Sequence, residues 1–131
     1  MIALDTNVLL RFLVADDAEQ NRRAAEFIKT VLENKGTLYI SDIVLVETVW
    51  VLSRSYQLSR QEIVSVLRKL LAAQHVVFSA SDEVARALNA FEQGSGGFAD
   101  YLIREQAYRA GCESILTFDR ALLKESGFIQ P

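Results

Sequence analysis

The chain has 131 residues, of which 50% are hydrophobic and 24% are charged, and its formal net charge is −3. This size and composition predict one soluble globular domain and exclude a largely disordered chain. The acidic balance excludes a protein that coats nucleic acid through a broad basic surface, although nucleic acid remains open as a substrate.

The chain begins with a strand, a polar turn and two helices. Residues 1–4 predict a short buried strand, and apolar residues at helical spacing follow over 8–12. Asp16 and Asp17 indicate the next turn. Apolar positions at helical spacing then predict a second helix over 18–34.

The strand and helix pattern repeats in the middle of the chain. Strand-forming residues occupy 37–40, and Ser41 is a suitable N-cap for a helix over 42–55. Ser59 and Glu62 have the spacing of a capping box at the start of another helix. That helix and the strand after it are expected over residues 59–73 and 76–78.

The last third of the chain contains a glycine-rich loop between two helices. The helices are predicted over 82–93 and 98–110, and residues 94–97 form the turn that joins them. A buried strand is expected over 114–118. A final helix and an edge strand are predicted over 120–126 and 128–130.

This alternation of strands and helices defines the fold class. Parallel strands need helical crossovers, so the pattern predicts a single-domain three-layer α/β sandwich with a mostly parallel central sheet. In such sheets ligands bind beyond the carboxyl ends of the strands. Polar residues that directly follow strands are therefore the first candidates for a functional site.

Four acidic residues stand out by their positions. Asp5 and Asp119 follow the first and fourth predicted strands, and Asp100 lies in the first turn of its helix, although each alone is more often a cap or turn residue. Glu47 interrupts an otherwise apolar helix, where a buried carboxylate requires a cation or an arginine partner.

The chemistry of these side chains indicates a hard metal ion. Carboxylate oxygens without histidine or cysteine suit Mg²⁺ or Mn²⁺ and not structural zinc. Such ions activate water and neutralise charge on a phosphate. If the parallel sheet is correct, all four acids converge at one edge.

Four segments of the chain resemble conserved motifs of PIN-domain nucleases, and most closely those of the VapC toxins of bacterial toxin–antitoxin pairs. These segments are residues 2–10, 41–50, 98–103 and 116–119. The resemblance implies an acidic site that holds Mg²⁺ or Mn²⁺ and activates water for attack on an RNA phosphodiester. The residues implied are Asp5, Glu47, Asp100 and Asp119.

The resemblance also implies partners and supporting residues. Relatives of this type are typically homodimers, and a small antitoxin protein lays a segment along an apolar groove and blocks the acidic pocket. One departure concerns Phe98, which lies where many relatives carry a further acid. The number of bound ions, one or two, therefore stays open. Supporting roles near the metal fall to Thr6, Asn7 and Thr117. Arg104 is not part of this implication: it follows Asp100 by one helical turn, which indicates either pairing with that acid or contact with a substrate phosphate.

Two other functions remain as alternatives. A catalytically silent PIN-like module that binds RNA or protein would be expected to lack some of the four acids, and none is missing. An aspartate-dependent phosphatase also starts from an aspartate after its first strand. It needs a second aspartate two residues later, where this chain has Asn7.

The remaining notable residues receive structural interpretations. Cys112 is the single cysteine, which favours a reducing cytoplasm, and it is interpreted as a small apolar filler. His75 receives no catalytic role, and Trp50 is assigned to core packing or to a partner groove. The candidates for phosphate contacts are Arg11, Arg54, Arg104 and Arg120.

Overall fold

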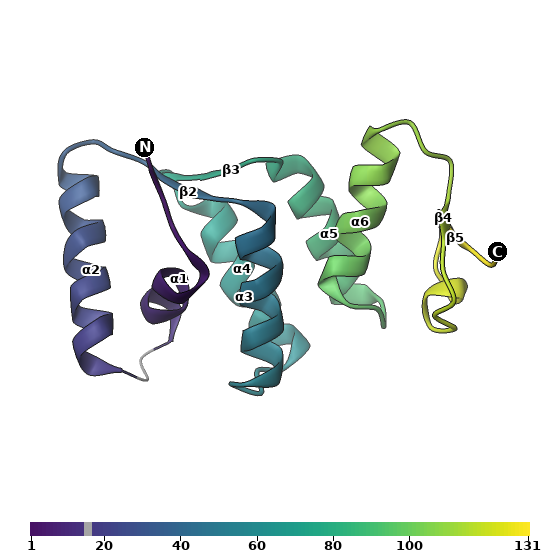
Figure 1. Ribbon diagram of the computed structural model, residues 1–131, viewed down its shortest axis with the longest axis horizontal. Coiled ribbons are helices and arrows are strands. Elements are labelled where there is room, and N and C mark those ends of the chain that lie inside the picture. Colours follow the sequence, from purple (N-terminus) through teal and green to yellow (C-terminus); the bar gives the residue numbers. More distant parts are fainter. Residues whose placement is uncertain (15–16) are drawn as a thin grey trace. The chain divides into compact units, whose positions relative to one another are not determined.

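The computed structural model describes residues 1–14 and 17–131, which fall into two compact units (Figure 1). The N-terminal unit is Met1–Ser79 and the C-terminal unit is Ala80–Pro131. Among the described residues, no helix combines the length and the apolar character needed to cross a membrane. The turn predicted at Asp16 lies outside the described residues, whereas Asp17 caps the helix that follows.

The N-terminal unit is built on a parallel sheet of β1 (Ile2–Ala3), β2 (Leu38–Ile40) and β3 (Val76–Phe78), in that order. Two helices follow β1 and two follow β2, which supply the crossovers that parallel strands need. These helices are α1 (Thr6–Leu13), α2 (Ala18–Glu33), α3 (Asp42–Arg54) and α4 (Arg60–Ala72).

Parallel pairing places the carboxyl ends of these strands at one edge of the sheet. Ile2 is opposite Leu38, and Leu38 is opposite Val76. Asp5 therefore leaves this edge into α1, and Ser41 leaves it into α3. The Ser41 side chain accepts a hydrogen bond from the Val44 backbone N–H, which starts α3 at the position that the sequence predicts.

The C-terminal unit contains a helical hairpin, α5 (Ser81–Gln93) and α6 (Phe98–Arg109), whose helices lie side by side in Figure 1. The start of α5 faces the end of α6, because Arg109 pairs with Glu83 at 3.1 Å. A second pair joins Arg86 to Glu105 at 3.1 Å. Both carboxylates are buried, so each is stabilised by an arginine from the opposite helix.

The last part of the C-terminal unit differs from the sequence prediction. The strand expected over 114–118 is only β4 (Ile115–Leu116), and Leu116 and Phe118 are 64% and 85% exposed. The predicted helix over 120–126 is reduced to a short 3-10 turn, η1 (Leu122–Lys124). Asp119 starts this tight turn by accepting a hydrogen bond from the Ala121 N–H.

The pairing of β4 explains its short length. β4 pairs in parallel with β5 (Phe128–Ile129) in a two-stranded sheet, in which the Ile115 and Thr117 N–H groups donate to the carbonyls of Gly127 and Ile129. The sequence predicts one central sheet, whereas the described strands form a sheet of three and a sheet of two. The α/β class with parallel strands is confirmed.

Candidate active site

The Asp5 side chain is oriented by a backbone N–H group at the start of α1. It is the N-cap of the helix, and its Oδ1 accepts a hydrogen bond of 2.7 Å from the Thr6 N–H. The carboxylate is exposed at the sheet edge. The capping role and a metal-binding role are compatible, because the cap uses only one of the two oxygens.

Glu47 is linked to the same region through Thr6. The Thr6 hydroxyl donates to Glu47 Oε1 at 3.3 Å, and Thr6 itself is only 8% exposed. One residue thus contacts both acids, Asp5 through its backbone and Glu47 through its side chain. Asp5 and Glu47 form the acidic pair of the N-terminal unit.

The expectation that Glu47 is buried is wrong. Helix α3 buries one face against the unit and leaves the other exposed, although both faces carry apolar residues. Glu47 lies on the opposite, exposed face together with Ile43 and Trp50. The run of apolar letters around Glu47 hides this arrangement, because several of the apolar residues are themselves exposed. The buried face consists of Leu45, Thr48, Val49 and Leu52.

The C-terminal unit carries the other two acids. Asp100 lies in the first turn of α6, where its Oδ2 accepts a hydrogen bond of 3.0 Å from the Gly97 N–H. Asp119 Oδ1 accepts from the Ala121 N–H at 2.9 Å, and the Asp119 N–H donates to Thr117 Oγ1 at 3.0 Å. Each carboxylate is therefore oriented by its own turn.

The four carboxylates share one property that suits a cation. Within its own unit, and among the described residues, each has one oxygen held by a protein donor and a second oxygen that accepts no hydrogen bond. None is paired with lysine or arginine there. Oxygen ligands without histidine or cysteine fit Mg²⁺ or Mn²⁺.

Each unit contains two of the four acids. Taken by itself, neither unit gathers three acidic, histidine or cysteine side chains around one point, as far as its residues are described. The convergence of both pairs on one ion stays a prediction.

The supporting residues occupy different environments. Thr6 contacts Asp5 and Glu47, and Thr117 contacts Asp119, as described above. Asn7 is exposed at the start of α1. Arg104 instead donates to Glu105 and to the Ser126 carbonyl, and its guanidinium lies over the rings of Tyr101 and Phe128. These contacts favour a structural role for Arg104 over a phosphate contact.

The structure also gives the contacts and exposure of two other arginines and of the single cysteine. Arg11 donates to Gln20 at 2.6 Å and to Tyr56 at 3.2 Å, whereas Arg120 is exposed. Cys112 is exposed and is no apolar filler, because it follows the turn at Gly111 and not a packed segment.

Trp50 is not part of the core. It is 60% exposed on α3, and the Arg54 guanidinium lies 5.8 Å from its ring centroid. The assignment to core packing is therefore wrong, and the alternative of a partner groove stays a prediction.

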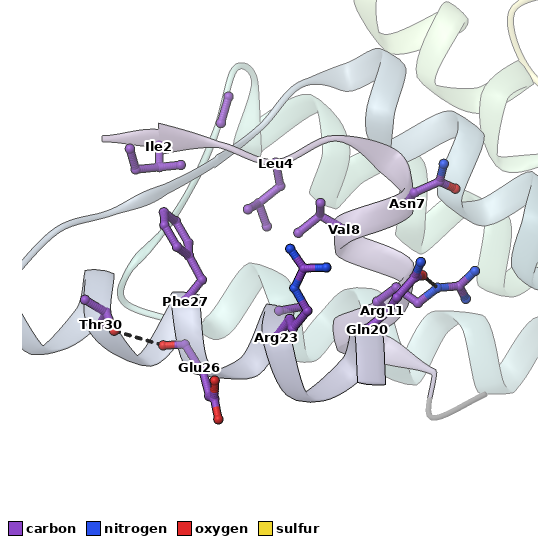
Figure 2. A pocket seen from close by; sticks show the side chains of 12 residues that line it. Ile2, Leu4, Asn7, Val8, Arg11, Gln20, Arg23, Glu26, Phe27 and Thr30 are labelled. Atoms are coloured by element: carbon purple, nitrogen blue, oxygen red, sulfur yellow. Dashed lines mark hydrogen bonds between the residues drawn. The ribbon is translucent and has the colours of Figure 1, made fainter. Parts of the chain in front are cut away.

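A cavity of about 680 Å³ lies beside β1, between α1 and α2 (Figure 2). Its apolar lining includes Leu4, Val8 and Phe27, and the Arg23 side chain points into it between these residues. Asn7 lies at one end of the cavity, two residues from Asp5. The cavity thus reaches the part of the N-terminal unit that carries the acidic pair.

Comparison with known proteins identifies the family. A match to the PIN domain covers residues 2–127, so the chain belongs to the PIN-domain family. A curated relative, the VapC ribonuclease of Aquifex aeolicus (strain VF5), is 26% identical over 128 residues. The aligned region makes up 98% of this chain and 93% of that relative.

Proposed function

We propose that this PIN-domain protein is a Mg²⁺-dependent endoribonuclease and the toxin of a VapBC-type toxin–antitoxin pair. The observation that carries the proposal is the similarity to a VapC ribonuclease over nearly the full length of both chains. The presence and orientation of all four acids also support it, since a silent module has no need of them.

The proposed roles follow from the donor set. Asp5, Glu47, Asp100 and Asp119 hold the ion, each through the oxygen that accepts no hydrogen bond from the described residues of its own unit. When bound, Mg²⁺ or Mn²⁺ supplies activation of water and neutralises charge on the scissile phosphate. Thr6 orients the Glu47 carboxylate through its hydroxyl, and Thr117 supports the turn of Asp119.

The first test compares two aspartates that have the same local role. Asp5 and Asp17 are both helix N-caps, and each accepts a hydrogen bond from a backbone N–H in its first turn. Asp5→Asn removes a carboxylate from the acidic pair, whereas Asp17→Asn changes a cap outside it. Cleavage of structured RNAs is measured with Mg²⁺ and with EDTA for both variants and for the unchanged chain.

We expect cleavage by the unchanged chain and by Asp17→Asn in Mg²⁺, loss of cleavage in EDTA, and a reduction of at least about 100-fold for Asp5→Asn. Cleavage that persists equally in EDTA and in Asp5→Asn would contradict the metal mechanism. No cleavage of any RNA would favour the silent binding module.

The antitoxin partner is proposed to occupy the cavity beside β1. An apolar segment matches the lining by Leu4, Val8 and Phe27, and an acidic residue of that segment would pair with Arg23. An arginine of the partner would reach the acidic pair, because a guanidinium binds two carboxylate oxygens at once. A small open reading frame next to this gene would support a toxin–antitoxin pair, and its absence would point to a free-standing nuclease. We also propose that the protein is a homodimer and acts in the cytoplasm.

A further inference from the structure

A buried tyrosine follows Asp100 directly and reaches the glycine-rich loop. Tyr101 is 0% exposed, and its hydroxyl accepts a hydrogen bond of 2.9 Å from the Gly96 N–H. The same hydroxyl donates to Glu125 Oε1 at 2.6 Å. Glu125 Oε1 also accepts from the Ser95 N–H at 3.2 Å. Tyr101 and Glu125 together therefore hold two consecutive amides of the loop.

Gly94 is required by the same pair of side chains, and Gly96 lies close to Leu122. A Cβ atom on Gly94 would lie 2.0 Å from the Tyr101 hydroxyl and 2.6 Å from Glu125 Oε1. On Gly96 it would lie 2.7 Å from Leu122 Cδ2. The φ angle of Gly94 is −96°, which any residue adopts, so close approach and not backbone conformation selects glycine there.

The loop ends on Asp100. Gly97, the next residue after the clamped amides, donates its N–H to Asp100 Oδ2. The position of the loop therefore sets the orientation of this carboxylate. Tyr101 acts on Asp100 twice, as its neighbour in α6 and through the loop that it holds.

Glu125, the second residue of this pair, is connected to Asp119 through a series of turns. The Leu123 N–H donates to the Asp119 carbonyl at 3.2 Å, and the Glu125 N–H donates to the Leu122 carbonyl at 2.8 Å. Residues 119–125 are thus a run of hydrogen-bonded turns with Asp119 at one end and Glu125 at the other. Arg104, one turn after Tyr101, adds a second tie through its bond of 3.0 Å to the Ser126 carbonyl.

We propose that Tyr101 and Glu125 are positioning residues that fix the Asp100 carboxylate relative to the Asp119 carboxylate and thereby set the affinity of the chain for its divalent cation. The inference rests on the proposed function, because it takes these two acids as ligands of that ion. Two carboxylates that are already fixed bind an ion with less loss of conformational entropy than two mobile ones. Groups behind metal ligands typically change affinity by about 10- to 100-fold.

The test is Mn²⁺ binding by the metal-depleted full-length chain, measured by electron paramagnetic resonance of free Mn²⁺ well below the melting temperature of each variant. Tyr101→Phe keeps the ring but removes the hydroxyl and with it the bonds to Gly96 and Glu125, and Glu125→Ala removes the acceptor. Both are expected to raise the Mn²⁺ dissociation constant about 10-fold. Glu125→Gln retains an acceptor oxygen and is expected to restore binding close to that of the unchanged chain.

The matched control is Tyr108→Phe, which removes a hydroxyl from the same helix two turns further on. It is expected to bind Mn²⁺ like the unchanged chain. Tyr101→Phe and Glu125→Ala in one chain should weaken binding by less than the sum of the two separate effects, because both changes remove the hydrogen bond between Tyr101 and Glu125.

The possible failures are distinguishable. Unchanged Mn²⁺ affinity in both Tyr101→Phe and Glu125→Ala, even with a lowered melting temperature, would make the pair merely structural and overturn the inference alone. Equal weakening in Glu125→Gln and Glu125→Ala would also overturn it. An unchanged chain that binds no Mn²⁺ would overturn both this inference and the proposed metal mechanism. Weak binding in the variants together with an unchanged chain that cuts no RNA would support the inference and contradict the RNA assignment.

Discussion

At the scale of single residues, three of the acidic side chains combine a capping role in a helix or turn with the proposed role in metal binding. Asp5, Asp100 and Asp119 each accept a backbone N–H at a helix start or turn. A cap of this kind orients a carboxylate without using its second oxygen. Local structure therefore does not compete with metal binding at these positions. It also lowers the conformational entropy that each carboxylate would lose on binding a metal ion.

Thr6 provides a sharp test at this scale, because its hydroxyl is the one described side-chain donor to Glu47. Thr6→Val keeps the shape of the side chain and removes the hydroxyl, whereas Thr6→Ser retains it. We expect Thr6→Val to lower the rate of RNA cleavage in limiting Mg²⁺ about 10-fold, and Thr6→Ser to stay near the unchanged rate.

The folding stability of Thr6→Val should be nearly unchanged, since a methyl group replaces a buried hydroxyl. Equal cleavage rates for Thr6→Val and the unchanged chain would show that Glu47 needs no support from Thr6. Rates are best compared over a Mg²⁺ titration, because lost orientation raises the Mg²⁺ concentration needed for half-maximal cleavage.

At the scale of elements, helix α4 illustrates how local signals determine a boundary. The Ser59 hydroxyl accepts from the Glu62 N–H at 3.1 Å, and the Ser59 N–H donates to the Glu62 carboxylate at 3.0 Å. This is the capping box that the sequence predicts. Ser59→Ala is expected to lower the free energy of unfolding by about 1 kcal/mol, measured by urea denaturation.

The same capping box adds a pH dependence with a definite sign. The backbone hydrogen bond from Ser59, and secondly its side-chain bond, lower the pKa of Glu62. The stabilisation is therefore present above the ordinary glutamate pKa, about 4.3, and is lost as the pH falls through the lower pKa of the folded state. The unchanged chain should exceed Glu62→Gln in stability at neutral pH, and this difference should shrink below about pH 4. A difference that grows on acidification would contradict this account.

The C-terminal elements show where local signals are insufficient. The strand predicted over 114–118 and the helix predicted over 120–126 are both shorter in the structure. Strand length depends on pairing with β5, which lies more than ten residues away along the chain. Asp119 also favours a tight turn by accepting the Ala121 N–H, and this competes with a longer helix.

At the scale of the whole molecule, the alternation of strands and helices and the parallel pairing follow from the sequence pattern, whereas the division into a sheet of three strands and a sheet of two does not. The four acids are predictable as candidates because they stand at strand ends, at a helix start and within an apolar run. The exposure of Glu47 is not predictable in this way, because it depends on which face of α3 packs inward. The contact between Tyr101 and Glu125 joins residues 24 apart and belongs to no local motif, so only the structure reveals it.

The central claim is that acids from both units serve one ion, and iron-directed cleavage of the backbone tests it most directly. Fe²⁺ takes the place of Mg²⁺, and ascorbate with hydrogen peroxide then produces radicals that cut the chain close to the bound iron. Mass spectrometry of the fragments locates the cuts, and excess Mg²⁺ should suppress them. The proposed function predicts cuts next to all four acids, Asp5, Glu47, Asp100 and Asp119. Cuts confined to one unit, or cuts that excess Mg²⁺ leaves unchanged, would contradict a shared metal centre.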